Sequence, residues 1–148
     1  AKFAPEGTRG VGGGIVQYDY KNVNLTDATN ELNEQTLLVA MVETPNAIEN
    51  IDEIASVKGI DVIMIGTNDL AMASGCPQDF GNPIIVKSYE KVAMSCEKYG
   101  KWLGSGGVKD PDIAKKYIKM GANFFLAGQD IGFLLSASKD RIDLLRES

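Results

Sequence analysis

Residues 37–69 carry the pattern that decides the fold, and they read LLVAMVETPNAIENIDEIASVKGIDVIMIGTND. The nearly continuous apolar run Leu37–Val42 is typical of a strand covered on both faces. Thr44 and Pro45 then supply an N-cap and a first helical residue, and Gly59 closes the helix. The apolar residues between them follow at helical spacing: Ala47, Ile48, Ile51, Ile54 and Ala55. A second apolar run, Val62–Ile65, comes next, so this stretch predicts two buried strands joined by a helix.

The same alternation continues to the end of the chain. Further helices are expected over residues 83–99, from Asp110 to Gly121 and up to Leu145, and further strands at Lys101–Gly104 and Asn123–Leu126. The residues expected to face inward from these helices are Ile85, Val92, Ala93, Cys96, Ile113, Tyr117 and Ile118. Four strand–helix units in a row predict parallel strands with right-handed crossovers. Because no linker divides the chain, we expect a single α/β unit over residues 1–148.

Such a parallel sheet belongs either to a doubly wound fold or to a barrel. The dinucleotide-binding doubly wound fold places G-x-G-x-x-G between its first strand and helix, whereas Val42 is followed by Glu43, Thr44 and Pro45. The glycine-rich stretch Arg9–Gly14 does not stand between a strong strand and a helix. A complete (β/α)8 barrel takes about 250 residues. The 148 residues of this chain would hold about half of one.

Composition excludes several classes of function. Fifteen basic and twenty acidic residues give a net charge of −5 and a pI near 4.7, so bulk charge will not hold the chain to nucleic acid or to an anionic membrane. The apolar runs are too short to span a bilayer or to form a signal peptide, and we expect a cytoplasmic protein. Cys76 and Cys96 show no metal-ligand or redox spacing. The absence of histidine removes the commonest general base and zinc ligand.

Acidic residues follow two of the predicted strands. Glu43 comes after the first strand and Asp69 after the second. The carboxyl ends of parallel strands share one edge, where ligands bind in these folds. Two carboxylates tolerate each other best with a cation between them, and with room for water they suit Mg²⁺ or Mn²⁺. Such an ion can chelate a 2-oxo acid and stabilise its enolate.

Structural roles for the same residues stay open. Asp69 can be a helix N-cap, and Glu43 can favour the dipole of the helix that follows it. Gly104–Gly107 can cradle a phosphate, as late loops of barrels do, or can form a tight turn. Trp102 and Tyr117 are expected in the core or in an interface.

Several segments together carry a family resemblance. They are Pro5–Gly12, Val42–Ala47, Gly59–Asp61 with Ile65–Leu70, Gly100–Lys101, Tyr117–Ala122 and Ala127–Asp130. In this order and spacing they resemble the HpcH/HpaI aldolase family of metal-dependent class II pyruvate aldolases, over essentially the whole chain. The resemblance implies a (β/α)8 TIM barrel, of which this chain would hold the last four βα units.

The resemblance also implies a site and an activity. Glu43 and Asp69 would be the two protein ligands of a divalent metal, Mg²⁺ or Mn²⁺, with Co²⁺ as a further option. The backbone amides of Asn68 and Asp69 would hold the carboxylate of pyruvate. The implied activity is that of a carbon–carbon lyase (aldolase) joining or separating a 2-oxo acid and an aldehyde through a metal-bound pyruvate enolate. The implied assembly is a homo-oligomer, a hexamer in the family, with no nucleic-acid or membrane partner.

This sequence departs from the family pattern at several positions. Met41 stands where glutamine is usual, Thr67 where proline is usual, and Gly106 where an apolar pocket residue is usual. The family's catalytic histidine, its supporting aspartate and its arginine belong to the first half of the barrel, so no catalytic residue is expected within this chain. The alternative is a catalytically incomplete fragment or half barrel that binds metal or pyruvate, or only self-associates.

Overall fold

The computed structural model describes residues 1–12 and 14–146. Gly13, part of the glycine-rich stretch Arg9–Gly14, lies outside the described residues. Contacts divide the chain into two compact units, Ala1–Leu38 and Val39–Ser148. The expectation of one continuous α/β unit stays a prediction.

The first unit contains a helix that was not expected from the sequence. A 3-10 turn, η1 (Val16–Tyr18), and the helix α1 (Leu25–Gln35) surround a small core of Phe3, Ile15, Ala28 and Leu32. The buried Asn33 side chain accepts a hydrogen bond from the Phe3 amide at 2.7 Å and donates one to the Phe3 carbonyl at 3.0 Å. The available sequence signals were the N-cap Asn24 and the i, i+4 pair Ala28 and Leu32.

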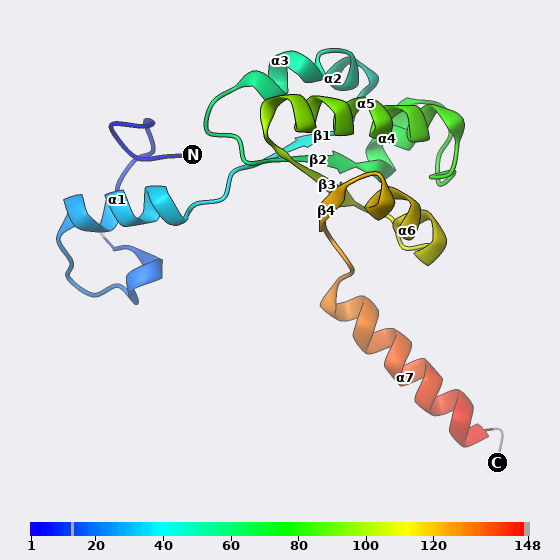
Figure 1. Ribbon diagram of the computed structural model, residues 1–148. Coiled ribbons are helices and arrows are strands. Elements are labelled where there is room, and N and C mark those ends of the chain that lie inside the picture. The colour runs from blue at the N-terminus through cyan, green and yellow to red at the C-terminus, as the bar shows by residue number, and fades with distance from the viewer. Residues whose placement is uncertain (13, 147–148) are drawn as a thin grey trace. The chain divides into compact units, whose positions relative to one another are not determined.

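The second unit is built on a parallel sheet whose strands follow one another in sequence order (Figure 1). The strands are β1 (Val39–Val42), β2 (Val62–Gly66), β3 (Trp102–Gly106) and β4 (Ala122–Phe125). Right-handed crossovers between sequential strands carry every connecting helix to the same face. A doubly wound sheet reverses its strand order partway, and this one does not. The observed order is therefore that of a (β/α)8 barrel segment, as predicted.

The helices largely follow their local sequence signals. They are α2 (Pro45–Glu49), α3 (Ile51–Ser56), α4 (Thr67–Ala73), α5 (Pro83–Tyr99), α6 (Pro111–Lys119) and α7 (Asp130–Arg146). Thr44, Asn82 and Asp110 are N-caps whose side chains accept hydrogen bonds from the first turns of α2, α5 and α6.

Two details of the helices differ from the prediction. The single helix expected between Thr44 and Gly59 is interrupted at Asn50, whose side chain donates to the Asn46 carbonyl at 2.9 Å. On α6, Tyr117 is buried, but Ile118 is 52% exposed rather than inward-facing. Neighbouring helical residues point about 100° apart, so only one of the two can lie on the narrow buried stripe.

One face of the sheet carries the core and the other is partly exposed. Val42, Ile63, Ile65 and Leu103 pack with residues of α3, α4 and α5 in one hydrophobic cluster, and Figure 1 shows helices α2, α3 and α5 along this side of the strands. Alternate strand residues point the other way. Of these, Met41 on β1 is 52% and Trp102 on β3 54% exposed, whereas Val62 and Met64 of the central strand β2 are buried. In a closed barrel this second face is the interior. Trp102 does not lie in the core of this chain, so its other expected place, an interface, stays a prediction, whereas Tyr117 is buried in the core.

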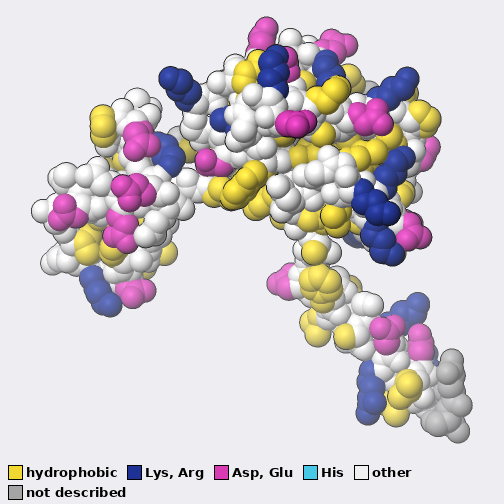
Figure 2. Space-filling view, viewed as in Figure 1, with side chains coloured by type: hydrophobic (Ala, Val, Ile, Leu, Met, Phe, Trp, Pro, Cys, Tyr) yellow, Lys and Arg dark blue, Asp and Glu magenta, His cyan; other side chains and the backbone are white. Residues whose placement is uncertain are grey.

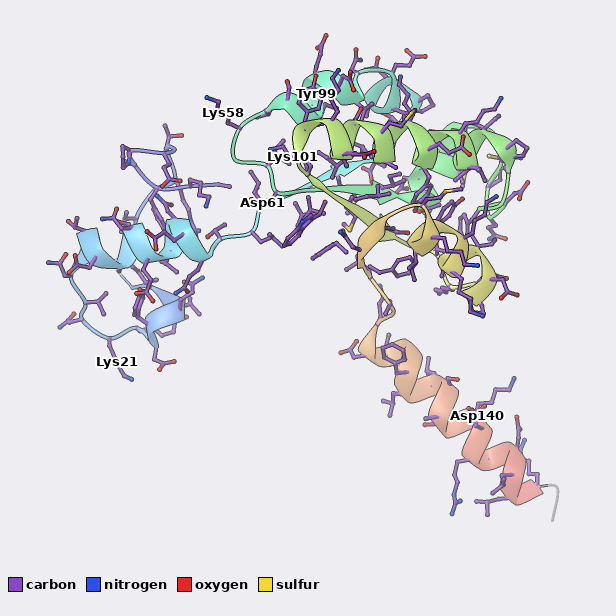
Figure 3. All side chains as sticks on the ribbon, viewed as in Figure 1. Lys21, Lys58, Asp61, Tyr99, Lys101 and Asp140 are labelled. Atoms are coloured by element: carbon purple, nitrogen blue, oxygen red, sulfur yellow. The ribbon has the colours of Figure 1, made fainter. Side chains whose placement is uncertain are left out.

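Lys101 secures the turn that leads into the sheet. Its Nζ donates to the Ile60 carbonyl at 2.7 Å and to the Val57 carbonyl at 3.3 Å, and Figure 3 shows it beside the loop that carries Lys58 and Asp61. These bonds fix the connection between α3 and β2 at the amino end of the strands. Among the described residues, no helix is long and apolar enough to cross a membrane.

Candidate metal and substrate site

The two predicted metal ligands lie at the same edge of the sheet. Glu43 directly follows β1, and Asp69 lies in the first turn of α4, which begins at the residue after β2. Val42 pairs with Ile65 at the ends of these two strands, so the chain segments carrying the carboxylates leave the sheet as neighbours. Glu43 is half-buried and Asp69 is exposed. The structure thus brings both residues to the carboxyl edge, as the sequence predicted.

Glycine at position 66 gives the Glu43 carboxylate its place. A Cβ at Gly66 would lie 2.7 Å from Glu43 Oε2 and 3.0 Å from Glu43 Cβ. Gly66 has φ −78°, a value open to any residue, so it is space rather than backbone conformation that requires glycine here. The carboxylate therefore extends across the end of β2, towards the segment that begins α4.

Neither carboxylate is committed to another group in the part of the chain that the structure describes. Within residues 1–12 and 14–146, no hydrogen bond or ion pair is found for the side chain of Glu43 or Asp69. The same residues contain no cluster of three or more His, Cys, Asp or Glu side chains. Two uncommitted carboxylates fit a hard divalent ion that keeps most of its positions for water or substrate oxygens. This donor set fits Mg²⁺ or Mn²⁺ better than Zn²⁺, which favours nitrogen and sulfur ligands.

The structure also tests the other roles considered for Asp69 and for Gly104–Gly107. Gly66, not Asp69, is the N-cap of α4, so the N-cap role considered for Asp69 is wrong. A carboxylate in the first turn still interacts favourably with the helix dipole. Gly104–Gly106 belong to β3, so the phosphate-binding loop considered at Gly104–Gly107 does not form. Only Gly107 lies beyond the strand.

Asn68 connects the site to the loop after β3. A Cβ at Gly107 would lie 2.5 Å from Asn68 Nδ2, and Gly107 has φ +88°, a conformation that favours glycine. The Asn68 side chain therefore packs against the backbone of this loop. Asn68 itself is exposed. The segment that bears Asn68 and Asp69 is thus held between the ends of β2 and β3.

A buried set of hydroxyl groups under this edge was not predicted from the sequence. Tyr89 Oη lies 2.7 Å from Thr67 Oγ1 and 2.7 Å from Ser105 Oγ, and all three side chains are buried. Burial raises the pKa of the Tyr89 phenol, which stays neutral. The i, i+4 and i, i+3 spacing of Ile85, Tyr89 and Val92 indicated a buried tyrosine, but nothing local indicated its hydroxyl partners.

The cysteines take no part in the site. Cys96 is buried on α5, and burial raises the pKa of its thiol to about 11. Cys76 is half-buried and follows α4. A thiol with so high a pKa is a poor nucleophile at neutral pH, in keeping with the passive role expected of Cys96.

A family model and a curated relative both relate this chain to aldolases. Residues 2–137 match the family described as HpcH/HpaI aldolase/citrate lyase. The 2-keto-3-deoxy-L-rhamnonate aldolase of Klebsiella pneumoniae subsp. pneumoniae is 32% identical over 145 residues, which are 98% of this chain and 54% of that protein.

Solved structures share the fold over nearly the whole chain. The crystal structure of an HpcH/HpaI aldolase from Desulfitobacterium hafniense DCB-2 superposes with a TM-score of 0.83 at 30% identity, covering 99% of this chain and 56% of the other. The citrate synthase SbnG gives a TM-score of 0.74 at 27% identity, covering 99% and 56%. The chain thus spans about half the length of the relatives it matches.

Proposed function

The chain belongs to the HpcH/HpaI aldolase/citrate lyase family, and from that premise we propose that it forms the metal- and substrate-binding part of a carbon–carbon lyase that acts on 2-oxo acids. One observation carries the proposal. The Glu43 carboxylate lies over Gly66, where no larger residue leaves room for it, beside the segment that bears Asp69. Two uncommitted carboxylates held at one sheet edge are suited to a divalent cation.

Each proposed role falls to a group at this edge. Glu43 and Asp69 bind the metal, Mg²⁺ or Mn²⁺ and, as a further option, Co²⁺. The backbone amides of Asn68 and Asp69 hold the carboxylate of the 2-oxo acid and fix its orientation. When bound, a divalent ion supplies Lewis-acid polarisation of the keto oxygen, which favours breaking or forming the adjacent carbon–carbon bond. The bond partner is an aldehyde.

We expect the base for the proton transfer in this reaction to come from outside this sequence. The sequence contains no histidine, and Glu43 and Asp69 are assigned to the metal. This observation favours a second candidate function, a piece that binds metal and 2-oxo acid without turnover. The two candidates share the site and differ only in whether residues beyond this sequence complete it.

We further propose that the protein works as a homo-oligomer in the cytoplasm. Helix α7 buries none of its residues. Ile131, Leu134, Leu135 and Ile142 recur at helical spacing and are each about half exposed or more, and Figure 2 shows hydrophobic side chains along this helix. An apolar stripe of this kind is stabilised when another surface covers it. A second copy of the chain can supply that surface.

Calorimetry with Mn²⁺ followed by oxalate, a planar mimic of the pyruvate enolate, tests the proposal. We expect saturable binding to the wild type and a loss of at least about tenfold in Mn²⁺ affinity in Glu43→Gln and Asp69→Asn, since each removes one charged ligand. Glu49→Gln, on the exposed surface of α2, is the matched control and should bind as the wild type does. Equal affinities in all four proteins would refute the site.

Turnover is measured separately, by NMR, as Mn²⁺-dependent exchange of the pyruvate methyl protons in D2O. Exchange that disappears in Glu43→Gln and Asp69→Asn supports the lyase. Binding of metal and oxalate without exchange supports the second candidate.

A further inference from the structure

Three buried hydroxyl groups meet directly beneath the candidate site. Tyr89 Oη, from the middle of α5, lies 2.7 Å from both Thr67 Oγ1 and Ser105 Oγ. Thr67 begins α4 after the end of β2, and Ser105 is the last residue but one of β3. None of the three side chains is measurably exposed. One phenol therefore ties together the carboxyl ends of two neighbouring strands.

The position of this phenol is fixed by its own surroundings. The rings of Tyr89 and Tyr117 stack with centroids 3.5 Å apart and planes inclined by 6°. The Tyr117 hydroxyl in turn donates to the Phe80 carbonyl in the loop before α5. The stack with the Tyr117 ring therefore restricts the orientation of the Tyr89 ring.

The residues that follow each hydroxyl partner form the site. Thr67 is followed by Asn68 and Asp69, and Ser105 by Gly106 and Gly107. Asn68 packs against Gly107, where an added Cβ would lie 2.5 Å from its Nδ2. The separation between Thr67 and Ser105 therefore decides how the segment with Asn68 and Asp69 lies against the loop after β3. A phenylalanine would fill the same core volume as Tyr89 without setting that separation.

We propose that Tyr89 is a positioning residue: its hydroxyl, through Thr67 and Ser105, holds the turn that carries Asn68 and Asp69 in the geometry that binds metal and 2-oxo acid. This inference rests on the function proposed above, because it assigns Tyr89 a part in placing the ligands named there. Tyr89 itself touches neither metal nor substrate.

Two matched variants separate positioning from stability. Tyr89→Phe removes the hydroxyl that joins Thr67 to Ser105 and keeps the ring stack. Tyr117→Phe removes the hydroxyl of a second buried tyrosine and keeps the same stack, but the partner of that hydroxyl is the Phe80 carbonyl in the loop before α5. Both variants lose buried hydrogen bonding, so both should unfold at lower urea concentration. Thr67→Val, which removes one partner hydroxyl from the other side, should reproduce the effect of Tyr89→Phe.

The readouts are the affinity of the full chain for oxalate in saturating Mn²⁺ and the amide hydrogen exchange of residues 66–69 and 105–107 in the ligand-free protein. We expect Tyr89→Phe and Thr67→Val to weaken oxalate binding about tenfold and to speed exchange in these two segments. Tyr117→Phe should leave the oxalate affinity unchanged. It should speed exchange in these two segments no more than its overall loss of stability accounts for. Equal effects of Tyr89→Phe and Tyr117→Phe on both readouts would overturn the inference.

The exchange measurement keeps this inference distinct from the proposed function. If the wild type binds no Mn²⁺ or oxalate, the proposed function fails. Faster exchange confined to residues 66–69 and 105–107 in Tyr89→Phe would then still support the inference that the Tyr89 hydroxyl positions the ends of β2 and β3. Binding in the wild type with unchanged exchange and affinity in Tyr89→Phe refutes the positioning role alone.

Discussion

The close approach of Glu43 to Gly66 makes Gly66→Ala a sharp test of how the site is built. The new methyl carbon would lie 2.7 Å from Glu43 Oε2, about 0.7 Å inside the 3.4 Å at which ordinary van der Waals contact begins. It would also lie 3.0 Å from Glu43 Cβ and 3.2 Å from Met41 Sδ. Rotating the end of the Glu43 side chain relieves only the first of these contacts. The Glu43 side chain must therefore leave its place, or the ends of β1 and β2 must separate.

Either adjustment removes Glu43 from the proposed metal site while leaving its charge in the protein. We expect Mn²⁺ affinity to fall at least about tenfold, equivalent to about 1.4 kcal/mol, and stability to fall by about 1–3 kcal/mol through overpacking. Calorimetry measures the first quantity and urea unfolding the second.

Gly104→Ala is the matched control for this prediction. Its methyl carbon would lie 3.0 Å from Met64 Cβ and 3.1 Å from Met64 Cα. This contact is also between β2 and β3, but Glu43 takes no part in it. We expect a comparable loss of stability, about 1–3 kcal/mol, with Mn²⁺ affinity unchanged. Full Mn²⁺ affinity in Gly66→Ala would refute the view that the Glu43 carboxylate must lie over Gly66 to bind metal.

Three further predictions concern the rest of the chain. Thr44→Ala should destabilise the protein by about 1 kcal/mol in urea unfolding, because the Thr44 side chain accepts a hydrogen bond from Ala47 N at 3.2 Å as the N-cap of α2; a change within error would contradict the capping role. Burial raises the pKa of the Cys96 thiol to about 11, so the stability that this thiol contributes should be full below pH 9 and should decline, by on the order of 2 kcal/mol, as pH rises towards 11. Cys96→Ala should lack this part of the decline. Parallel profiles of stability against pH for the two proteins would refute the prediction. Replacing Leu134 and Leu135 by lysine should shift the molar mass measured by light scattering to that of a single chain. The reason is that charged side chains would then have to be buried against the apolar surface that covers α7. An unchanged oligomer would exclude this stripe from the interface.

Local patterns in the sequence predicted most of the secondary structure of residues 39–146. Strand β2 and helix α5 lie where short apolar runs, proline and caps indicated them. Where local signals were weak or split, the prediction failed: α1 was missed, and the expected helix after Thr44 breaks at Asn50. A periodicity reports only which side of an element is apolar, so it could not tell that Tyr117 would be buried and Ile118 exposed.

The presence of Glu43 and Asp69 after successive strands followed from the sequence alone, because parallel strands present their carboxyl ends at one edge whatever lies between them. The way that edge is held together did not. The contact of Glu43 with Gly66, of Asn68 with Gly107, and of Tyr89 with Thr67 and Ser105 joins segments that lie far apart along the chain. Backbone periodicity is a local property and can be read from neighbouring residues, whereas these contacts exist only once the helices have packed on the sheet and fixed the distances between its strands.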